Sequence, residues 1–214
     1  MILDRVLNFL FPSKCRICKK RGKFDVCEKC IRQIERYEDL HIINFQNRYL
    51  DTLIYFFKYK DYIRKLILDY KFFNKFYIGK VFSKIILKNE KICRNLKLYD
   101  IIIPVPMHKI KKRERGYNQT EILAQDLAKN LKLEYSENIL IKTINNKKQS
   151  SLSRKERYEN IKNVFKIVKS DKIKDKKILL IDDICTTSAT LEECAKVLKH
   201  AGVSMVVALV IAKD

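Results

Sequence analysis

The stretch KKILLIDDICTTSATLEECAKVLKHAGVSMVVALVIA, residues 176–212, decides the fold of this chain. Residues 176–182 and 203–212 are apolar runs that predict strands, and residues 190–202 between them carry the apolar spacing of an amphipathic helix stopped by Gly202. Both strands lack polar alternation, which is typical of strands buried on both faces of a parallel sheet. The stretch therefore predicts a strand–helix–strand unit of an α/β fold.

The same alternation extends upstream. YDIIIPVP (99–106), NILIKTI (138–144) and NVFKIV (163–168) predict strands, and NQTEILAQDLAKNL (118–131) and SLSRKERYENI (151–161) predict helices. We therefore expect a mostly parallel sheet with helices on both faces. In such a sheet, ligands bind beyond the carboxyl ends of the strands, where loops lead into helices.

The turn after the strand at 176–182 carries the densest group of polar residues at such a place. The loop and the first helical turn contain Thr186, Thr187, Ser188, Ala189 and Thr190. Their hydroxyls and backbone N–H groups suit a phosphate. Asp182 and Asp183 would repel that phosphate, so they favour sugar hydroxyls or hydrated Mg²⁺. A phosphorylated sugar satisfies both halves; the alternative is an ordinary turn with Ser and Thr caps.

A basic segment follows the strand at 99–106 and is the second candidate for ligand binding. It contains Lys109, Lys111, Lys112, Arg113 and Arg115, followed by Gly116. Clustered cations, with arginine as a bidentate donor, suit a pyrophosphate group. Asn118 and Gln119 either cap the next helix or contact the ligand.

Four cysteines near the N-terminus have the spacing of a metal site. Cys15, Cys18, Cys27 and Cys30 form C-x2-C-x8-C-x2-C. Two such pairs can place four thiolates around one ion, and a four-thiolate site leaves no open position for catalysis. The sequence predicts structural Zn²⁺ in a module over residues 1–38, too small to fold on a core of its own.

Residues 45–214 are predicted to form the α/β domain, beginning with an aromatic and lysine-rich helical block at 45–82. Within the block, Ile63, Leu66, Ile67 and Tyr70 have helical spacing. Most of its rings are expected in the core; the alternative is a surface for single-stranded nucleic acid. The candidates for that surface are Tyr59, Lys71, Phe73, Lys75 and Phe76.

The charge balance bears on the partner. The chain has 46 Lys and Arg against 25 Asp and Glu, a formal net charge of +21. This favours an anionic partner such as nucleic acid, although codon bias accounts for the charge equally well. The apolar run MVVALVIA (205–212) is too short to cross a bilayer, so a cytosolic protein without a transmembrane segment is expected.

These motifs carry a family resemblance. LLIDDICTTSAT (179–190) resembles the phosphoribosyl pyrophosphate (PRPP) motif of type I phosphoribosyltransferases. IPVPMHKIKKRERGYNQTEILA (103–124), KQSSLSRKERYENIKNVF (148–165) and the cysteine module after LFPSKC are similar to the ComF family of competence proteins. One position differs, because Ser188 stands where the PRPP motif usually has glycine, and a Cβ there would strain the loop.

The resemblance implies roles for these residues. Asp182 and Asp183 would hold the ribose hydroxyls, residues 186–190 the 5′-phosphate, and Arg115 and Gly116 the pyrophosphate, with Mg²⁺ accompanying PRPP. Residues 149–157 correspond to a flap. It also implies a role in DNA uptake, handling single-stranded DNA at the cytosolic side of the inner membrane beside other uptake proteins. The alternative is an active PRPP-dependent transferase, although no segment clearly recognises a nucleobase.

Overall fold

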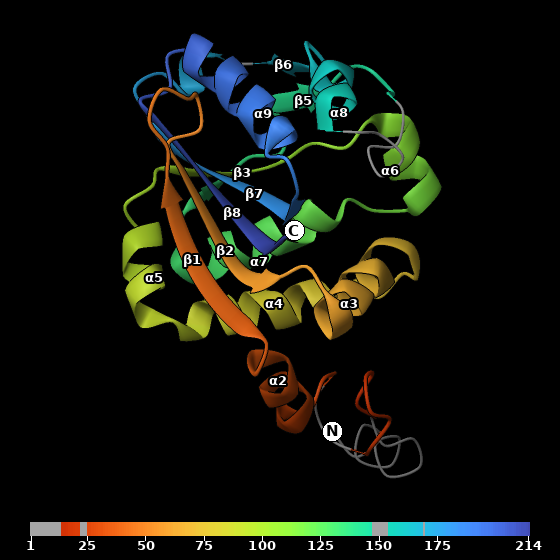
Figure 1. Ribbon diagram of the computed structural model, residues 1–214. Helices are drawn as coiled ribbons and strands as arrows, with labels where there is room; N and C mark the ends of the chain where they lie inside the picture. The colour runs from red at the N-terminus through yellow and green to blue at the C-terminus, as the bar shows by residue number, and fades with distance from the viewer. Residues whose placement is uncertain (1–13, 22–24, 147–153, 169) are drawn as a thin grey trace, which may run out of the picture. The chain divides into compact units, whose positions relative to one another are not determined.

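A computed structural model describes residues 14–21, 25–146, 154–168 and 170–214 (Figure 1). The chain divides into two compact units, Met1–Glu38 and Asp39–Asp214. In the first unit, Lys14 and Arg21 form a β-bridge and α2 spans Glu28–Glu35.

The second unit is built on a six-stranded sheet with the order β1-β2-β8-β7-β3-β4. The strands are β1 (Glu38–Asn44), β2 (Thr52–Lys58), β8 (Met205–Lys213), β7 (Lys177–Cys185), β3 (Ile101–Pro104) and β4 (Glu134–Tyr135). From β2 to β4 each neighbouring pair is parallel. The predicted α/β fold with a mostly parallel sheet is confirmed.

Helices cover both faces of the sheet (Figure 1). On one face lie α3 (Asp61–Phe72), α4 (Tyr77–Lys88), α5 (Glu90–Leu96) and α7 (Gln119–Leu131). On the other lies α9 (Ala189–His200), beside α8 (Arg154–Ile161) and the strands β5 (Leu140–Lys142) and β6 (Phe165–Ile167). The short α6 (Lys109–Arg115) follows β3, and a 3₁₀ turn spans Ser170–Lys172.

Alternate residues of the central strands supply the two halves of the core. Ile178 and Leu180 of β7 pack with Cys194 and Leu198 of α9 in one buried cluster. Because side chains alternate across a strand, the equally buried Leu179 faces the other helical layer. Burial on both faces is the reason that these strands read as unbroken apolar runs.

Three expectations need correction. The strands predicted at 138–144 and 163–168 form a separate antiparallel pair, β5–β6, and do not join the main sheet. Each has one fully buried residue, as suits a ribbon covered on one side. The block at 45–82 is not wholly helical, since β2 pairs with β8. The strand predicted to end at Asp182 continues to Cys185.

A close helix contact supports the region where the functional site lies. Tyr70 of α3 is fully buried, and its hydroxyl donates to the Gln119 carbonyl at 2.5 Å. Gly79 of α4 lies against that ring, so a Cβ there would collide with the Tyr70 hydroxyl. Two helices therefore approach closely because one has no side chain at the contact.

We expect Gly79→Ala to lower the free energy of unfolding by about 1–3 kcal/mol, because the added methyl forces Tyr70 to move in a packed core. Urea denaturation measures it. The matched control is Ser83→Ala on the same helix: the Ser83 hydroxyl is buried without a hydrogen-bond partner among the described residues, so its removal should cost nothing. Equal midpoints for Gly79→Ala and the wild type would contradict the prediction.

Candidate functional site

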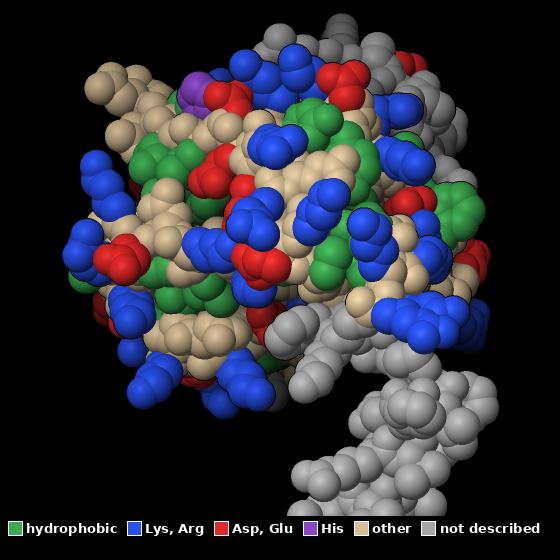
Figure 2. Space-filling model, turned by 90° about the horizontal axis from the view of Figure 1, so that it is seen from below, with side chains coloured by type: hydrophobic (Ala, Val, Ile, Leu, Met, Phe, Trp, Pro, Cys, Tyr) green, Lys and Arg blue, Asp and Glu red, His purple; other side chains and the backbone are tan. Residues whose placement is uncertain are grey.

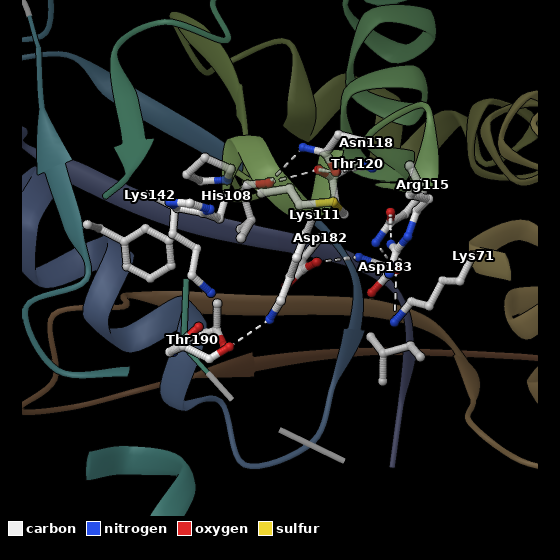
Figure 3. A pocket seen from close by; sticks show the side chains of 17 residues that line it. Lys71, His108, Lys111, Arg115, Asn118, Thr120, Lys142, Asp182, Asp183 and Thr190 are labelled. Atoms are coloured by element: carbon white, nitrogen blue, oxygen red, sulfur yellow. Dashed lines mark hydrogen bonds and ion pairs between the residues drawn. The ribbon is translucent and has the colours of Figure 1, made fainter. Parts of the chain in front are cut away.

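A polar pocket lies beyond the carboxyl ends of β3 and β7 (Figure 3). Its acidic residues, Asp182 and Asp183, come from β7. Its cationic residues come from three other elements: Lys71 from α3, Lys111 and Arg115 from α6, and Lys142 from β5. The start of α7 contributes Asn118, Gln119 and Thr120, and α9 contributes Thr190. Opposite charges from distant parts of the chain thus share one cavity.

Asp183 is buried and held by two donors. Gln119 Nε2 donates to Asp183 Oδ2 at 2.7 Å, and Lys71 Nζ lies 3.0 Å from the same oxygen. Gln119 is itself oriented, because its Oε1 accepts from Arg115 at 2.5 Å. A buried carboxylate needs such partners to remain charged. Arg115, Gln119 and Lys71 therefore fix the orientation of one carboxylate in the pocket.

Asp182 is less enclosed, and its environment favours the protonated form. Its Oδ1 accepts the backbone N–H of Asp183 at 2.8 Å. Burial, and then the neighbouring charge of Asp183, raise the pKa of Asp182 to about 8, against the opposing effect of Lys71 and Lys142. A ligand that brings hydroxyl donors or a cation relieves this unfavourable charge.

The raised pKa of Asp182 predicts a pH dependence of stability. In the folded state Asp182 keeps its proton up to a pH of about 8, whereas in the unfolded state it releases the proton at its ordinary pKa of 3.8. The contribution of Asp182 to the free energy of unfolding is therefore fully present below pH 3.8 and is lost as pH rises through about 8. We expect the free energy of unfolding of the ligand-free protein to fall more steeply between those values than that of Asp182→Asn. Urea titrations across this pH range measure it; parallel profiles would contradict it.

The predicted phosphate-binding turn joins β7 to α9. Thr186, Thr187 and Ser188 lie between the two elements, and α9 begins at Ala189, whose N–H donates to Thr187 Oγ1 at 3.4 Å. Of this turn, Thr190 lines the pocket together with the two aspartates. The first N–H groups of a helix have no carbonyl partner within the helix, so a helix N-terminus at this place suits an anion.

Ser188 adopts the conformation that glycine prefers. Its φ is +64°, in the left-handed region, which costs a residue with a Cβ about 1 kcal/mol. Its hydroxyl lies 3.2 Å from Cys185 Sγ. The turn thus retains the backbone geometry expected of a glycine although a serine occupies the position.

The basic segment after β3 is a helix, and helical periodicity separates its cations. Lys111 and Arg115, four residues apart, reach the pocket. Lys109 lines a neighbouring cavity and Arg113 is exposed. Gly116, at a φ of +84°, ends the helix. Of Lys109, Arg113, Arg115 and Gly116, which were predicted to bind pyrophosphate, Arg115 is the one that lines the pocket with the acidic pair.

Several pocket residues were missed or assigned another role. Lys142, at the end of β5, was not predicted to belong to the site. Burial, and then the charge of Lys111, lower the pKa of Lys142 to about 8. Its Nζ lies 5.6 Å from the Phe165 ring centroid. Lys71 was assigned to nucleic-acid binding. Asn118 caps α7 by accepting the Thr120 N–H, while Gln119 contacts Asp183. The predicted flap at 149–157 lies partly outside the described residues, and its end forms the start of α8.

An exposed aromatic group connects α3 to α4. It consists of Phe72, Phe73, Lys75 and Phe76, here called the α3–α4 patch. The three phenylalanines are 59%, 66% and 49% exposed. The Arg115 guanidinium lies 5.2 Å from the Phe72 ring centroid, so the patch adjoins the pocket. Tyr59, also a nucleic-acid candidate, is half-buried after β2.

The four cysteines of the first unit form a cluster with tetrahedral spacing. All four Sγ atoms lie within 4.8 Å of one another. Cys15 and Cys30 are 3.8 Å apart, and Cys18 and Cys27 are 3.7 Å apart. A zinc ion with Zn–S bonds of about 2.3 Å requires S–S separations of about 3.8 Å, whereas a disulfide requires about 2.05 Å. The cluster therefore fits Zn²⁺.

Among the helices that the structure describes, none combines the length and apolarity that crossing a membrane requires.

Comparisons with known proteins find matches to the C-terminal part of the chain and to most of its length. The phosphoribosyl transferase domain profile matches residues 119–214. Competence protein F of Haemophilus influenzae is 32% identical over 196 residues, which are 88% of this chain and 85% of that protein. Competence protein ComFC of Bacillus subtilis is 28% identical over 193 residues, 88% of this chain and 72% of that protein. DNA utilization protein YhgH of Escherichia coli K12 is 28% identical over 144 residues, 66% and 63% of the two chains.

Proposed function

Because this chain belongs to the ComF family of competence proteins, with a phosphoribosyl transferase domain, we propose that it binds PRPP with Mg²⁺ and handles single-stranded DNA during DNA uptake. In this proposal it works on the cytosolic side of the inner membrane, beside other DNA-uptake proteins. The pocket beyond β3 and β7 takes PRPP, and the α3–α4 patch takes DNA.

The observation that supports PRPP most strongly is that one pocket holds both acidic and basic side chains. Asp182 and Asp183 suit the ribose hydroxyls, while Lys111 and Arg115 suit a pyrophosphate. The N-terminus of α9 adjoins the acidic pair and suits the 5′-phosphate. Mg²⁺ prefers carboxylate and phosphate oxygens, and the half-buried Asp182 is the carboxylate best able to face it. Bound Mg²⁺ would supply charge neutralisation for the phosphates.

Calorimetric titration of PRPP in the presence of Mg²⁺ tests this proposal. We expect one PRPP to bind each chain, with competition by ribose 5-phosphate and by inorganic pyrophosphate, because each fills part of the pocket. Absence of heat in the wild type, with or without Mg²⁺, would overturn it.

The α3–α4 patch supports the DNA part of the proposal. Exposed aromatic rings beside cations bind single strands by stacking with bases and by attraction to phosphates. Lys75 belongs to the patch, and its Nζ lies 6.0 Å from the Phe73 ring centroid. Lys and Arg side chains are also spread over the face seen in Figure 2, with hydrophobic side chains exposed between them. Such a surface attracts an anionic strand at long range.

We expect Phe73→Ala and Phe76→Ala each to weaken binding of single-stranded DNA by roughly 5- to 100-fold, because each removes about one stacked base. Fluorescence anisotropy with a labelled oligonucleotide measures it, and the wild-type affinity should fall steeply with salt. Leu98→Ala is the control, since Leu98 is 67% exposed but follows α5. Binding that is insensitive to salt, or equal in all variants, would contradict this assignment.

One observation favours an active transferase as the second candidate function. Lys111 and Arg115 lie in the same pocket as the acidic pair, where they can stabilise a departing pyrophosphate while a nitrogen nucleophile attacks C1 of PRPP. Acceptor-dependent release of pyrophosphate from PRPP tests this activity. Release that no base or nucleic acid stimulates would leave PRPP as a bound ligand alone.

A further inference from the structure

Lys71 reaches the pocket from outside the segments that form the rest of the site. It lies in the last turn of α3, and its Nζ is 3.0 Å from Asp183 Oδ2 (Figure 3). Its side chain is 20% exposed, whereas that of nearby Lys75, which pairs with Asp69 at 2.7 Å, is 39% exposed. Two lysines from one short stretch therefore have different environments, and Lys71 faces the acidic pair.

The contact between Lys71 and Asp183 fixes which carboxylate oxygen of Asp183 can bind a ligand. Among the described residues, the Gln119 hydrogen bond and the Lys71 ion pair both fall on Asp183 Oδ2. Two donors on one oxygen fix the rotation of the carboxylate, and the other oxygen, Oδ1, remains for a hydroxyl of the ligand. A carboxylate held in one orientation binds a hydroxyl without a further ordering cost.

The neighbours of Lys71 keep it in register with the site. On one side, Tyr70 is fully buried; its hydroxyl donates to the Gln119 carbonyl, and its own carbonyl accepts from the Tyr117 hydroxyl. On the other side, the Phe72 ring lies under Arg115. The residues before and after Lys71 thus contact the same segment, Arg115–Gln119, that supplies the second donor to Asp183.

We propose that Lys71 is a positioning residue that orients Asp183 toward the sugar, so that the pocket selects a ribosyl phosphate over a phosphate alone. This inference rests on the proposed PRPP-binding function. It adds that Lys71 of α3 contributes to recognition of the ribose. Lys71 acts through Asp183 and not as a contact of the DNA strand.

The experiment compares two probes, ribose 5-phosphate and inorganic phosphate, by calorimetry. We expect Lys71→Met to lower the affinity for ribose 5-phosphate by roughly 2- to 10-fold, because Asp183 is then no longer held and must be ordered when the sugar binds, and to leave the affinity for phosphate unchanged. Lys71→Arg should restore most of the loss, because it keeps a charged donor near the carboxylate. Lys65→Met is the matched control, because Lys65 is an exposed lysine of the same helix, and it should leave both affinities unchanged. Circular dichroism checks that each variant is folded.

A double-mutant cycle decides whether Lys71 acts through Asp183. In the Asp183→Asn background, Lys71→Met should have little further effect. An equal loss in both backgrounds would overturn the proposal, because Lys71 would then contact the ligand itself. The proposal is also overturned if Lys71→Met loses affinity for ribose 5-phosphate and for phosphate by the same factor, or if it keeps the wild-type affinity for both. If the wild type binds neither ribose 5-phosphate nor PRPP, the proposed function itself fails.

Discussion

Removing the metal from the four-cysteine cluster is expected to unfold residues 14–38 and leave the unit Asp39–Asp214 folded. Apart from Cys15 and Cys30, the buried apolar residues described in the first unit are Val26, Ile31 and Ile34. Three such side chains contribute about 5–9 kcal/mol, far less than the ordering entropy of this segment. A structural zinc site contributes about 10–16 kcal/mol in comparable small modules, so we expect folding here to depend on a zinc ion held by the four cysteines.

Hydrogen exchange read by mass spectrometry, with metal analysis of the same samples, measures this effect. We expect about one zinc per chain in the wild type, and fast exchange confined to 14–38 after chelation or in Cys15→Ser. Cys93→Ser is the matched control, because Cys93 lies in α5, within the other unit. A clearly lower zinc content, or unchanged protection after chelation, would contradict the prediction.

The acidic pair should have the second largest effect. We expect Asp182→Ala/Asp183→Ala to weaken PRPP binding by roughly 100- to 10,000-fold, because in the proposed complex each aspartate bonds a ribose hydroxyl, and a hydrogen bond to a charged group is worth about 1.5–3 kcal/mol. The substitution also removes negative charge that repels phosphates. Affinity for inorganic pyrophosphate should therefore stay the same or rise, while affinity for PRPP falls.

This opposite response separates loss of sugar recognition from general damage to the pocket. Calorimetry with the two ligands in Mg²⁺ measures it, and Asp171→Asn in the exposed 3₁₀ turn is the control. A variant that loses pyrophosphate and PRPP in equal measure is damaged more widely. A variant that retains PRPP would show that the aspartates do not hold the ribose.

The parts of the fold predicted correctly are those where one physical signal dominates. Burial on both faces makes β3, β7 and β8 unbroken apolar runs, and α7 and α9 carry a clear apolar face. The acidic pair was singled out because two adjacent aspartates at a predicted strand end had no evident structural purpose; the structure places both in the pocket, and their role stays a prediction. The spacing of the four cysteines is likewise specific, because paired C-x2-C motifs are typical of zinc sites.

The errors arise where tertiary contacts decide. The strand β2 was predicted as part of a helical block, because its aromatic residues suit either a helix or a strand. Its pairing partner β8 lies about 150 residues further along the chain, so no local pattern indicates the pairing. Lys71 and Lys75 were both predicted to bind nucleic acid because both lie among aromatic residues. Lys71 belongs to α3, which ends at Phe72, so the helix directs Lys71 toward the pocket; Lys75 lies after the helix and is not positioned by it. Lys142 had no signal, because the antiparallel pairing of β5 with β6 places it.

The position of β8 between β2 and β7 has a consequence for how the protein is made. β2 leaves the ribosome early, but its parallel partner β8 begins at Met205, about 150 residues later. At a synthesis rate of about 5–20 residues per second, β2 waits roughly 7–30 s with one buried edge open. During that time the unpaired N–H and C=O groups along this edge are exposed to pairing with other chains. We therefore expect the main sheet to close late in synthesis, when β8 inserts between β2 and β7, and the nascent chain to be prone to aggregation before that point.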